Sequence, residues 1–201
     1  VLRDDSHRVA EVEEDLQAEV ETESSRVHFL GRSTTVVSVP IGVDYDRIQT
    51  MATDPTLPQE QHRLSQLLDL RAEIVGLGVD RLDYTKGIPE RLSAIDVLMT
   101  RRPALRGKLT FVQIGVPSRS SLESYAAVEH EIERTVETLN TKHAVPGGAP
   151  LGVLSTSALD AFSLTALYRL AHFCVVSSLH DGMNLVAKEF VAARDDDRGV
   201  L

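Results

Sequence analysis

The stretch EIVGLGVDRLDYTKGIPERL, residues 73–92, predicts one strand-to-helix junction of an α/β sheet. Residues 73–79 form an apolar run rich in strand-favouring residues, which is typical of a buried strand. Pro89 stands near the first position of the helix that follows, where a missing N–H is tolerated, and Pro103 lies past its end. The polar segment between strand and helix carries Arg81 and Lys86.

The same alternation of strand and helix continues along the chain. We expect further strands over residues 108–115, 151–154 and 173–178, and helices over residues 120–143, 163–171 and 183–193. A capping box formed by Ser120 and Glu123 opens the first of these helices. Strands that alternate with helices of ten or more residues predict an α/β fold, in which a parallel sheet carries helices on both faces.

The N-terminal part has a different pattern. Val9, Val12, Leu16 and Val20 recur at helical spacing, so we predict an amphipathic helix over residues 6–20. Two short strands follow over residues 26–31 and 34–43, with a turn near Ser33 and Thr34. The segment IGVDYDRI leads into a short helix, and a longer helix is expected over residues 57–70.

Composition limits the classes of protein. The 201 residues, 42% hydrophobic, suffice for one large domain, or for one domain plus part of another. Residues 1–25 contain nine acids against two arginines, a balance of −7, so only −2 of the net charge of −9 remains elsewhere. This argues against a nucleic-acid partner. Since the chain starts at Val1 and residues 199–201 resemble the start of another strand, we expect a fragment of a longer protein.

Several other site types find no support in the sequence. The run GLGVD lacks the third glycine of a dinucleotide fingerprint, and neither a phosphate-binding Walker loop nor a nucleophile elbow occurs. The seven histidines share no metal-ligand spacing, so we predict neither a metal nor a cofactor. Cys174 lies in the apolar run FCVVSS and is predicted to be a small buried hydrophobe. Without an apolar run of about 18 residues or a leader, the cytoplasm is the expected compartment.

Three strand-to-helix junctions carry polar residues. Arg81 and Lys86 lie beside the start of a helix, whose N–H groups favour an anion such as a phosphate or diphosphate. Arg119 stands before the next helix among serines, which suits a second anion. At the third junction, Asp181 and Gly182 form a turn, so the N–H groups of residues 183–186 would open a helix that carries Lys188 and Glu189. Ordinary solvated surface remains the alternative for each junction.

Three blocks at these junctions resemble one family. RLDYTKGIPERL (residues 81–92), QIGVPSRSSLESY (113–125) and LYRLAHFCVVSSLHDGMNLVAKEFVAAR (167–194) are similar, in order, to signature blocks of trehalose-6-phosphate synthases. These are retaining glycosyltransferases with two facing Rossmann-like domains, the GT-B architecture. The resemblance implies that residues 1–40 are the end of the N-terminal acceptor domain and part of the connection between the two domains. It implies that residues 41–201 form most of the Rossmann-like, nucleotide-sugar-binding C-terminal domain, without its end.

The resemblance also implies roles for matching residues. Arg81 and Lys86 would bind the diphosphate of UDP-glucose, Asp181 would hold glucose hydroxyls, and these three would be the catalytic residues. Arg119 would bind the phosphate of the acceptor, glucose 6-phosphate. The remaining donor-binding residues would be Asn184, Leu185, Val186, Ala187, Lys188 and Glu189, with Glu189 on the ribose.

The resemblance implies transfer with retention, although the blocks supply no pair of carboxylates across the scissile bond as in retaining glycosidases. It also implies front-face transfer, in which the leaving diphosphate helps to deprotonate the acceptor hydroxyl. His180 stands where many relatives have arginine, which leaves glycerol 3-phosphate open as an alternative acceptor. A non-catalytic nucleotide-sugar-binding module is a further alternative. Because a GT-B site closes across two domains, we expect the 201 residues alone to be inactive; no membrane partner is expected, and the oligomeric state is left open.

Overall fold

The computed structural model describes residues 19–201 apart from residues 22, 38, 118–122 and 197. These residues form two compact units, one ending at Gly42 and the other spanning Val43–Leu201. In the first unit, three antiparallel strands pair in the order β1-β2-β3. Their bounds are β1 Glu19–Glu21, β2 Arg26–Phe29 and β3 Arg32–Thr35.

This small sheet corrects two predictions. Val20 pairs with Val27 in the ladder, so the end of the segment predicted as a helix is a strand, while residues 1–18 lie outside the described part. The turn lies at Leu30 and Gly31 instead of Ser33, because positive φ angles of 48° and 73° at those residues suit a two-residue hairpin. The strand predicted over residues 34–43 ends at Thr35. Val39, beyond that end, is 80% exposed to solvent.

The second unit contains the predicted parallel sheet. Its four strands are β4 Ile74–Leu82, β5 Leu109–Pro117, β6 Gly152–Ser155 and β7 Phe173–Cys174, in the order β6-β5-β4-β7. β4 and β5 pair over their full length, from Ile74 opposite Leu109 to Leu82 opposite Pro117. Val200 forms a parallel bridge with Phe173, in agreement with the strand expected near the last residues.

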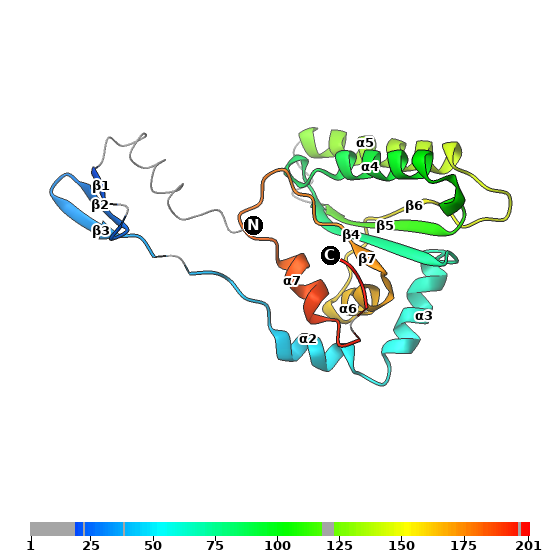
Figure 1. Ribbon diagram of the computed structural model, residues 1–201, viewed down its shortest axis with the longest axis horizontal. Coiled ribbons are helices and arrows are strands. Elements are labelled where there is room, and N and C mark those ends of the chain that lie inside the picture. Colours follow the sequence, from blue (N-terminus) through cyan, green and yellow to red (C-terminus); the bar gives the residue numbers. More distant parts are fainter. Residues whose placement is uncertain (1–18, 22, 38, 118–122, 197) are drawn as a thin grey trace. The chain divides into compact units, whose positions relative to one another are not determined.

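Helices cover both faces of this sheet (Figure 1). The helix α4 (Ile88–Arg101) and the helix α5 (Glu123–Lys142) lie on one face. On the other face are α2 Tyr45–Ala52, α3 Leu57–Leu67, α6 Ala161–Leu170 and α7 Leu185–Ala192. Two short 3-10 helices, η1 Tyr84–Lys86 and η2 Pro103–Leu105, flank α4. The predicted α/β architecture is therefore confirmed, whereas the capping box at Ser120 lies outside the described residues.

Local sequence explains where several helices begin. Asp44 accepts the N–H of Arg47 at 3.1 Å, and Asp160 accepts that of Ser163 at 2.8 Å, so each carboxylate caps the first turn of its helix. The same cap lets α6 start at Ala161, two residues before the predicted start. Pro89 lies in the first turn of α4, as predicted.

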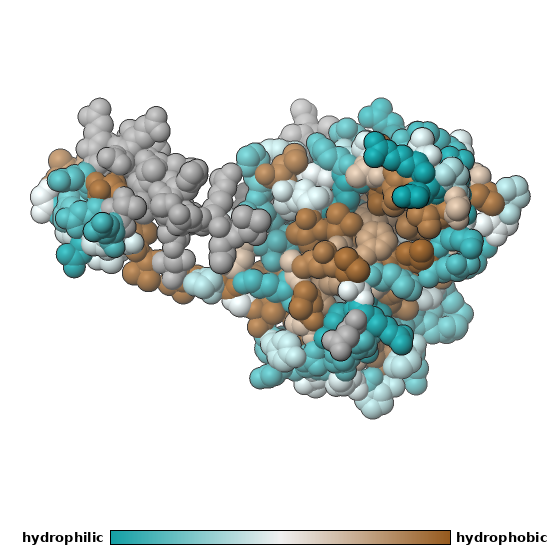
Figure 2. Space-filling view, in the orientation of Figure 1, coloured by the Kyte–Doolittle hydropathy of each residue, from teal (hydrophilic) through white to brown (hydrophobic). Residues whose placement is uncertain are grey.

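The core consists of one apolar layer on each side of the sheet. Leu92 and Met99 of α4 and Phe111 of β5 are fully buried on the side of the sheet that α4 and α5 cover. The opposite layer contains Tyr168 and Phe190, whose rings meet edge to face with centroids 6.1 Å apart. Figure 2 shows further apolar surface around β7 and the C-terminal end of the chain. The two layers hold the sheet rigidly enough to position the loops at its ends.

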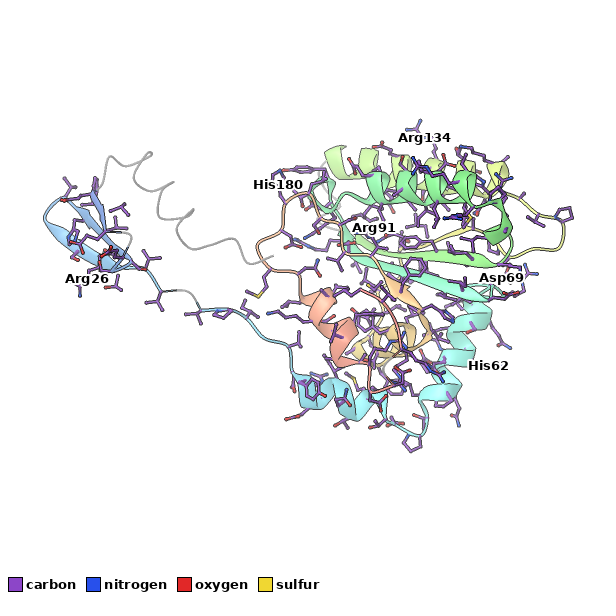
Figure 3. The ribbon with its side chains drawn as sticks, viewed as in Figure 1. Arg26, His62, Asp69, Arg91, Arg134 and His180 are labelled. Atoms are coloured by element: carbon purple, nitrogen blue, oxygen red, sulfur yellow. The ribbon has the colours of Figure 1, made fainter. Side chains whose placement is uncertain are left out.

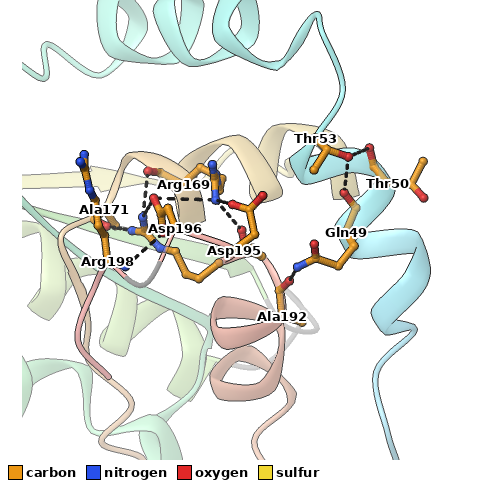
Figure 4. Close-up of polar contacts among 11 residues, drawn as sticks. Gln49, Thr50, Thr53, Arg169, Ala171, Ala192, Asp195, Asp196 and Arg198 are labelled. Atoms are coloured by element: carbon orange, nitrogen blue, oxygen red, sulfur yellow. Dashed lines mark hydrogen bonds and ion pairs between the residues drawn. The ribbon is translucent and has the colours of Figure 1, made fainter.

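A polar cluster fixes the C-terminal end of α7 (Figure 4). Arg194 donates to the carbonyl of Ala171 and lies 5.2 Å from the centre of the Phe190 ring, and Arg169 pairs with Asp195. On the other side of α7, the Gln49 amide of α2 donates to the carbonyl of Ala192. These contacts tie α7 to α2 and α6, so the beginning of α7 has a defined direction.

Candidate functional site

The carboxyl ends of the parallel strands carry the three predicted junctions. In open α/β sheets this edge is where ligands bind. The first junction, between β4 and α4, and the third, between β7 and α7, are described by the structure. Arg119, the candidate residue of the second junction, lies outside the described residues.

The β4–α4 junction is held by short-range contacts. The Asp83 carboxylate accepts both the N–H and the hydroxyl of Thr85 at 2.9 Å. Burial opposes ionisation of Asp83, but these hydrogen bonds outweigh it and lower the pKa of the carboxyl. Gly87 ends η1 with a φ of 61°, and a Cβ there would lie only 2.8 Å from the carbonyl oxygen of Ser177. Glycine is thus required both for the turn and for the close approach of the neighbouring loop.

The β7–α7 loop leaves the sheet earlier than predicted. The expected strand over residues 173–178 contains only Phe173 and Cys174, because the chain then turns towards the first junction. The N–H groups of Leu179 and His180 both donate to the carbonyl of Thr85, at 2.8 and 3.1 Å. Two loops that are about 95 residues apart in sequence are therefore joined through one carbonyl oxygen.

The start of α7 also differs from the prediction. Asn184 is the N-cap and its side chain accepts the N–H of Ala187 at 3.1 Å, so Leu185 is the first helical residue and residues 183 and 184 precede the helix. An asparagine at this position satisfies one N–H of the first turn. The N–H groups that open the helix are consequently those of Leu185 and Val186.

Lys86 and Asp181 meet between the two loops. Lys86 Nζ lies 2.8 Å from Asp181 Oδ2, and their side chains are 13% and 21% exposed. Asn184 Nδ2 and Ser178 Oγ donate to the same oxygen at 3.1 and 3.3 Å. Burial would raise the pKa of Asp181, but the bonds from Lys86 and Asn184 dominate and lower it. The pair therefore places one cation and one carboxylate at the same point of the sheet edge.

Arg81 lies in a different environment. It is exposed, one residue before the end of β4 and opposite Val116 of β5. Among the described residues its guanidinium makes no hydrogen bond, although its charge helps to lower the pKa of Asp83. The structure thus brings Lys86 and Asp181 into contact and leaves Arg81 beside them at the strand end without such a contact.

Lys188 and Glu189 of α7 point to different environments. Lys188 is exposed and its Nζ lies 3.4 Å from the sulfur of Met183, as a surface side chain of the helix. Glu189 is half-buried, and its Oε2 accepts the hydroxyl of buried Tyr168 at 2.8 Å. The surface interpretation therefore describes Lys188 but not Glu189, whose carboxylate is held by a buried tyrosine.

Sequence reasoning missed the buried arginine of α4. Arg91 is 3% exposed, and its Nη1 donates to Asp80 at 2.6 Å and to Gln113 at 2.9 Å. Burial raises the pKa of Asp80, and the Arg91 charge opposes that shift. The signal was present in the sequence, because Arg91 follows Ile88 by three residues and precedes Ile95 by four on the apolar stripe of α4.

Cys174 is a small buried side chain, as predicted. It is 3% exposed, and burial raises the pKa of its thiol to about 12, which makes it a poor nucleophile. Within the described residues, no three His, Cys, Asp or Glu side chains are grouped so that they could hold a metal ion. The described helices include none with the length and apolarity needed to cross a membrane.

Comparison with known proteins decides the family. The model of glycosyltransferase family 20 matches residues 3–201, nearly the whole chain. The chain belongs to glycosyltransferase family 20. This family 20 chain is 36% identical over 184 residues to alpha,alpha-trehalose-phosphate synthase (UDP-forming) A of Dictyostelium discoideum. It is 37% identical over 186 residues to the UDP-forming synthase of Botryotinia fuckeliana.

The family 20 chain aligns with only part of these relatives. The alignments cover 90% and 91% of the chain but 24% and 34% of the two synthases. Solved structures give the same picture. A synthase of Burkholderia xenovorans in complex with glucose-6-phosphate has a TM-score of 0.86 at 30% identity, over 96% of this chain and 42% of that one. An E. coli trehalose-6-phosphate structure bound with UDP-2-fluoro glucose has a TM-score of 0.78 at 31% identity. That match covers 89% of this chain and 38% of the E. coli chain.

These matches confirm two predictions made from the sequence. The resemblance of three blocks to trehalose-6-phosphate synthases is confirmed by the family and by its relatives. The Rossmann-like α/β fold of GT-B glycosyltransferases is confirmed by the solved neighbours.

Proposed function

We propose that this chain is the donor-binding part of a UDP-forming trehalose-phosphate synthase. The complete enzyme transfers glucose with retention from UDP-glucose to glucose 6-phosphate and releases UDP and trehalose 6-phosphate. The observation that carries the proposal is the contact of Lys86 with Asp181 at the carboxyl edge of the sheet. The relatives named as UDP-forming synthases, and the neighbours that contain a UDP-glucose analogue or glucose-6-phosphate, support it.

The donor's diphosphate lies, in this proposal, against Arg81 and Lys86. Both are cations beside the start of α4, where N–H groups also favour negative charge. As the bond from glucose C1 to the diphosphate oxygen breaks, negative charge grows on UDP, and the two cations stabilise it. Lys86 Nζ lies 2.8 Å from Asp181 Oδ2, which fixes where the lysine's charge stands at the sheet edge.

Asp181 and the start of α7 hold the rest of the donor. The carboxylate of Asp181 accepts glucose hydroxyls, and the N–H groups of Leu185 and Val186 contact the nucleotide. Glu189 accepts the ribose diol through Oε1, while Tyr168 occupies Oε2. Asn184 and Ala187 contribute indirectly, since their mutual hydrogen bond defines the start of the helix, and Lys188 lies on the surface beside them.

Transfer with retention proceeds on the front face of the sugar. The acceptor hydroxyl forms the new bond to C1 on the side that UDP leaves, and its proton passes to a diphosphate oxygen. No side chain acts as a nucleophile. Arg119 binds the phosphate of the acceptor. The catalytic role of the protein is then electrostatic, through Arg81, Lys86 and Asp181. The cytoplasm is the proposed compartment, consistent with a single buried cysteine.

A product assay on the full-length protein that carries this sequence tests the proposal. We expect trehalose 6-phosphate from UDP-glucose and glucose 6-phosphate, with the retained anomer identified by nuclear magnetic resonance. Arg81→Ala should lower the rate about 10² to 10³-fold, as loss of a transition-state donor does. Binding of UDP without any transfer would indicate a non-catalytic module instead, and near-normal turnover of the variant would remove Arg81 from the mechanism.

Glycerol 3-phosphate remains the second candidate acceptor because of His180. This residue is exposed and bonds through its backbone to Thr85, directly before Asp181 (Figure 3). The assay therefore includes both acceptors, with His180→Arg as the matched variant. Preference for glycerol 3-phosphate by the unaltered protein would establish the alternative.

A further inference from the structure

The guanidinium of Arg91 joins three elements beneath the candidate site. It projects from α4, and its Nη1 donates to Asp80 of β4 at 2.6 Å and to Gln113 of β5 at 2.9 Å. The side chains of Arg91 and Asp80 are only 1% and 4% exposed. A Cβ at Gly78 would lie 2.6 Å from Nη1, so the absence of a side chain there makes room for the guanidinium.

The same guanidinium reaches the third junction. Arg91 Nε donates to Ser177 Oγ at 3.0 Å, in the loop between β7 and α7. Ser177 lies two residues before Leu179, whose N–H bonds to Thr85, and four residues before Asp181. The contact with Arg91 therefore comes at the point where this loop leaves the sheet and approaches the β4–α4 junction.

The chemistry of the contact favours orientation over stability. A buried ion pair contributes little net stability, because desolvation of both charges offsets their attraction. A planar guanidinium, however, directs several N–H groups at fixed angles, which a lysine cannot do. Here those angles relate the ends of β4 and β5 to the loop that carries Asp181.

We propose that Arg91 is a positioning residue for glucosyl transfer. Through Ser177 it holds the β7–α7 loop against the β4–α4 junction, so that Asp181 meets Lys86 at a defined point. The proposal rests on the proposed function above for its catalytic consequence. The competing explanation is that Arg91 only neutralises Asp80 inside the fold.

Two variants of the full-length protein separate these explanations. Ser177→Ala removes the hydroxyl that contacts Arg91 but leaves the pair with Asp80 intact. Arg91→Lys keeps the charge beside Asp80 but loses the fork of donors. The matched control is Ser163→Ala, which removes a hydroxyl bonded to Glu60 at 2.7 Å on the opposite helical layer. Since Ser163 is more buried than Ser177, its loss should disturb stability at least as much.

The measurements are kcat, the KM for UDP-glucose, and hydrogen exchange of the Leu179 and His180 amides. We expect kcat to fall about 5- to 10-fold in Ser177→Ala with a smaller change in KM, and both amides to exchange faster. Arg91→Lys should lower kcat and speed the exchange of both amides in the same way as Ser177→Ala. Ser163→Ala should change neither kcat nor the exchange. Exchange and kcat equal to those of the control would overturn the positioning role.

The exchange measurement also keeps this inference separate from the proposed function. If the unaltered protein transfers no glucose, the proposed function fails, but faster exchange in Ser177→Ala would still support a role of Arg91 in holding the loop. If transfer occurs and both variants match Ser163→Ala in every measurement, the proposed function stands and the positioning role is wrong.

Discussion

The β4–α4 junction and the β7–α7 loop meet at the same edge of the sheet, but different kinds of contact hold them. The first is short, and contacts within five residues define it, since Asp83 binds Thr85 and Gly87 supplies the left-handed turn. The second is longer and depends on distant residues, namely the Thr85 carbonyl, Lys86 and Arg91. The β4–α4 junction is therefore defined by its own residues, whereas the β7–α7 loop takes its position from its contacts with that junction and with Arg91.

The contact between the two loops should show the largest effect. We expect Lys86→Ala in the full-length protein to lower kcat about 10² to 10³-fold, because it removes a cation from the leaving group and the partner of Asp181. Steady-state kinetics measure the loss. The control is Lys108→Ala, which removes an exposed lysine 3.6 Å from Glu73 near the start of β4. Equal losses in both variants would contradict a specific role of Lys86.

A substitution within the β4–α4 junction should have the second largest effect, on the stability of the fold. Gly87→Ala combines a positive φ with a Cβ 2.8 Å from the Ser177 carbonyl, so we expect a loss of about 2–3 kcal/mol in the free energy of unfolding. Gly147→Ala is the matched control, because its φ is +72° but nothing lies within 4 Å of the added Cβ. Denaturant unfolding should show only about 1 kcal/mol there. Similar losses at both sites would mean that contact between the loops contributes little.

The support of α7 should show a smaller effect. Tyr168→Phe removes the hydroxyl that holds Glu189, and we expect UDP to bind about 5- to 10-fold more weakly, as loss of one hydrogen bond of ordinary strength implies. Titration calorimetry with the full-length protein measures this affinity. Tyr45→Phe, at an exposed tyrosine in α2, is the control. Unchanged affinity would remove the link between Glu189 orientation and nucleotide binding.

Acid should slightly reduce the stability that the Asp83 carboxylate gives to the β4–α4 junction. The pKa of Asp83 is lower in the folded than in the unfolded protein, so the unfolded state takes up the proton first. The stabilisation from Asp83 is complete above the unfolded pKa of about 3.9 and is lost as the pH falls through the lower folded value. Asp83→Asn keeps one acceptor oxygen but does not titrate there. Its free energy of unfolding should therefore fall less steeply below about pH 4 than that of the unaltered protein, and parallel slopes would contradict this.

Much of the fold was predictable because its signals are local. Alternating apolar runs and capped helices predicted the parallel sheet. The strand predicted over residues 73–79 runs over Ile74–Leu82, so Arg81 lies inside the strand and not in the loop that follows it. The predictions that failed depend on distant partners. Val20 belongs to a strand because it pairs with Val27, and the strand at Phe173 is short because its loop turns to Thr85.

The candidate site divides in the same way. Sequence alone placed Arg81, Lys86 and Asp181 at strand-to-helix junctions and Glu189 within the helix that follows Asp181, because glycines, prolines and caps act over a few residues. Only the tertiary structure decided that Lys86 touches Asp181, that Tyr168 holds Glu189, and that Arg91 reaches Ser177. Such contacts join residues up to 95 positions apart, and they depend on how the sheet orders its strands, which no local pattern specifies.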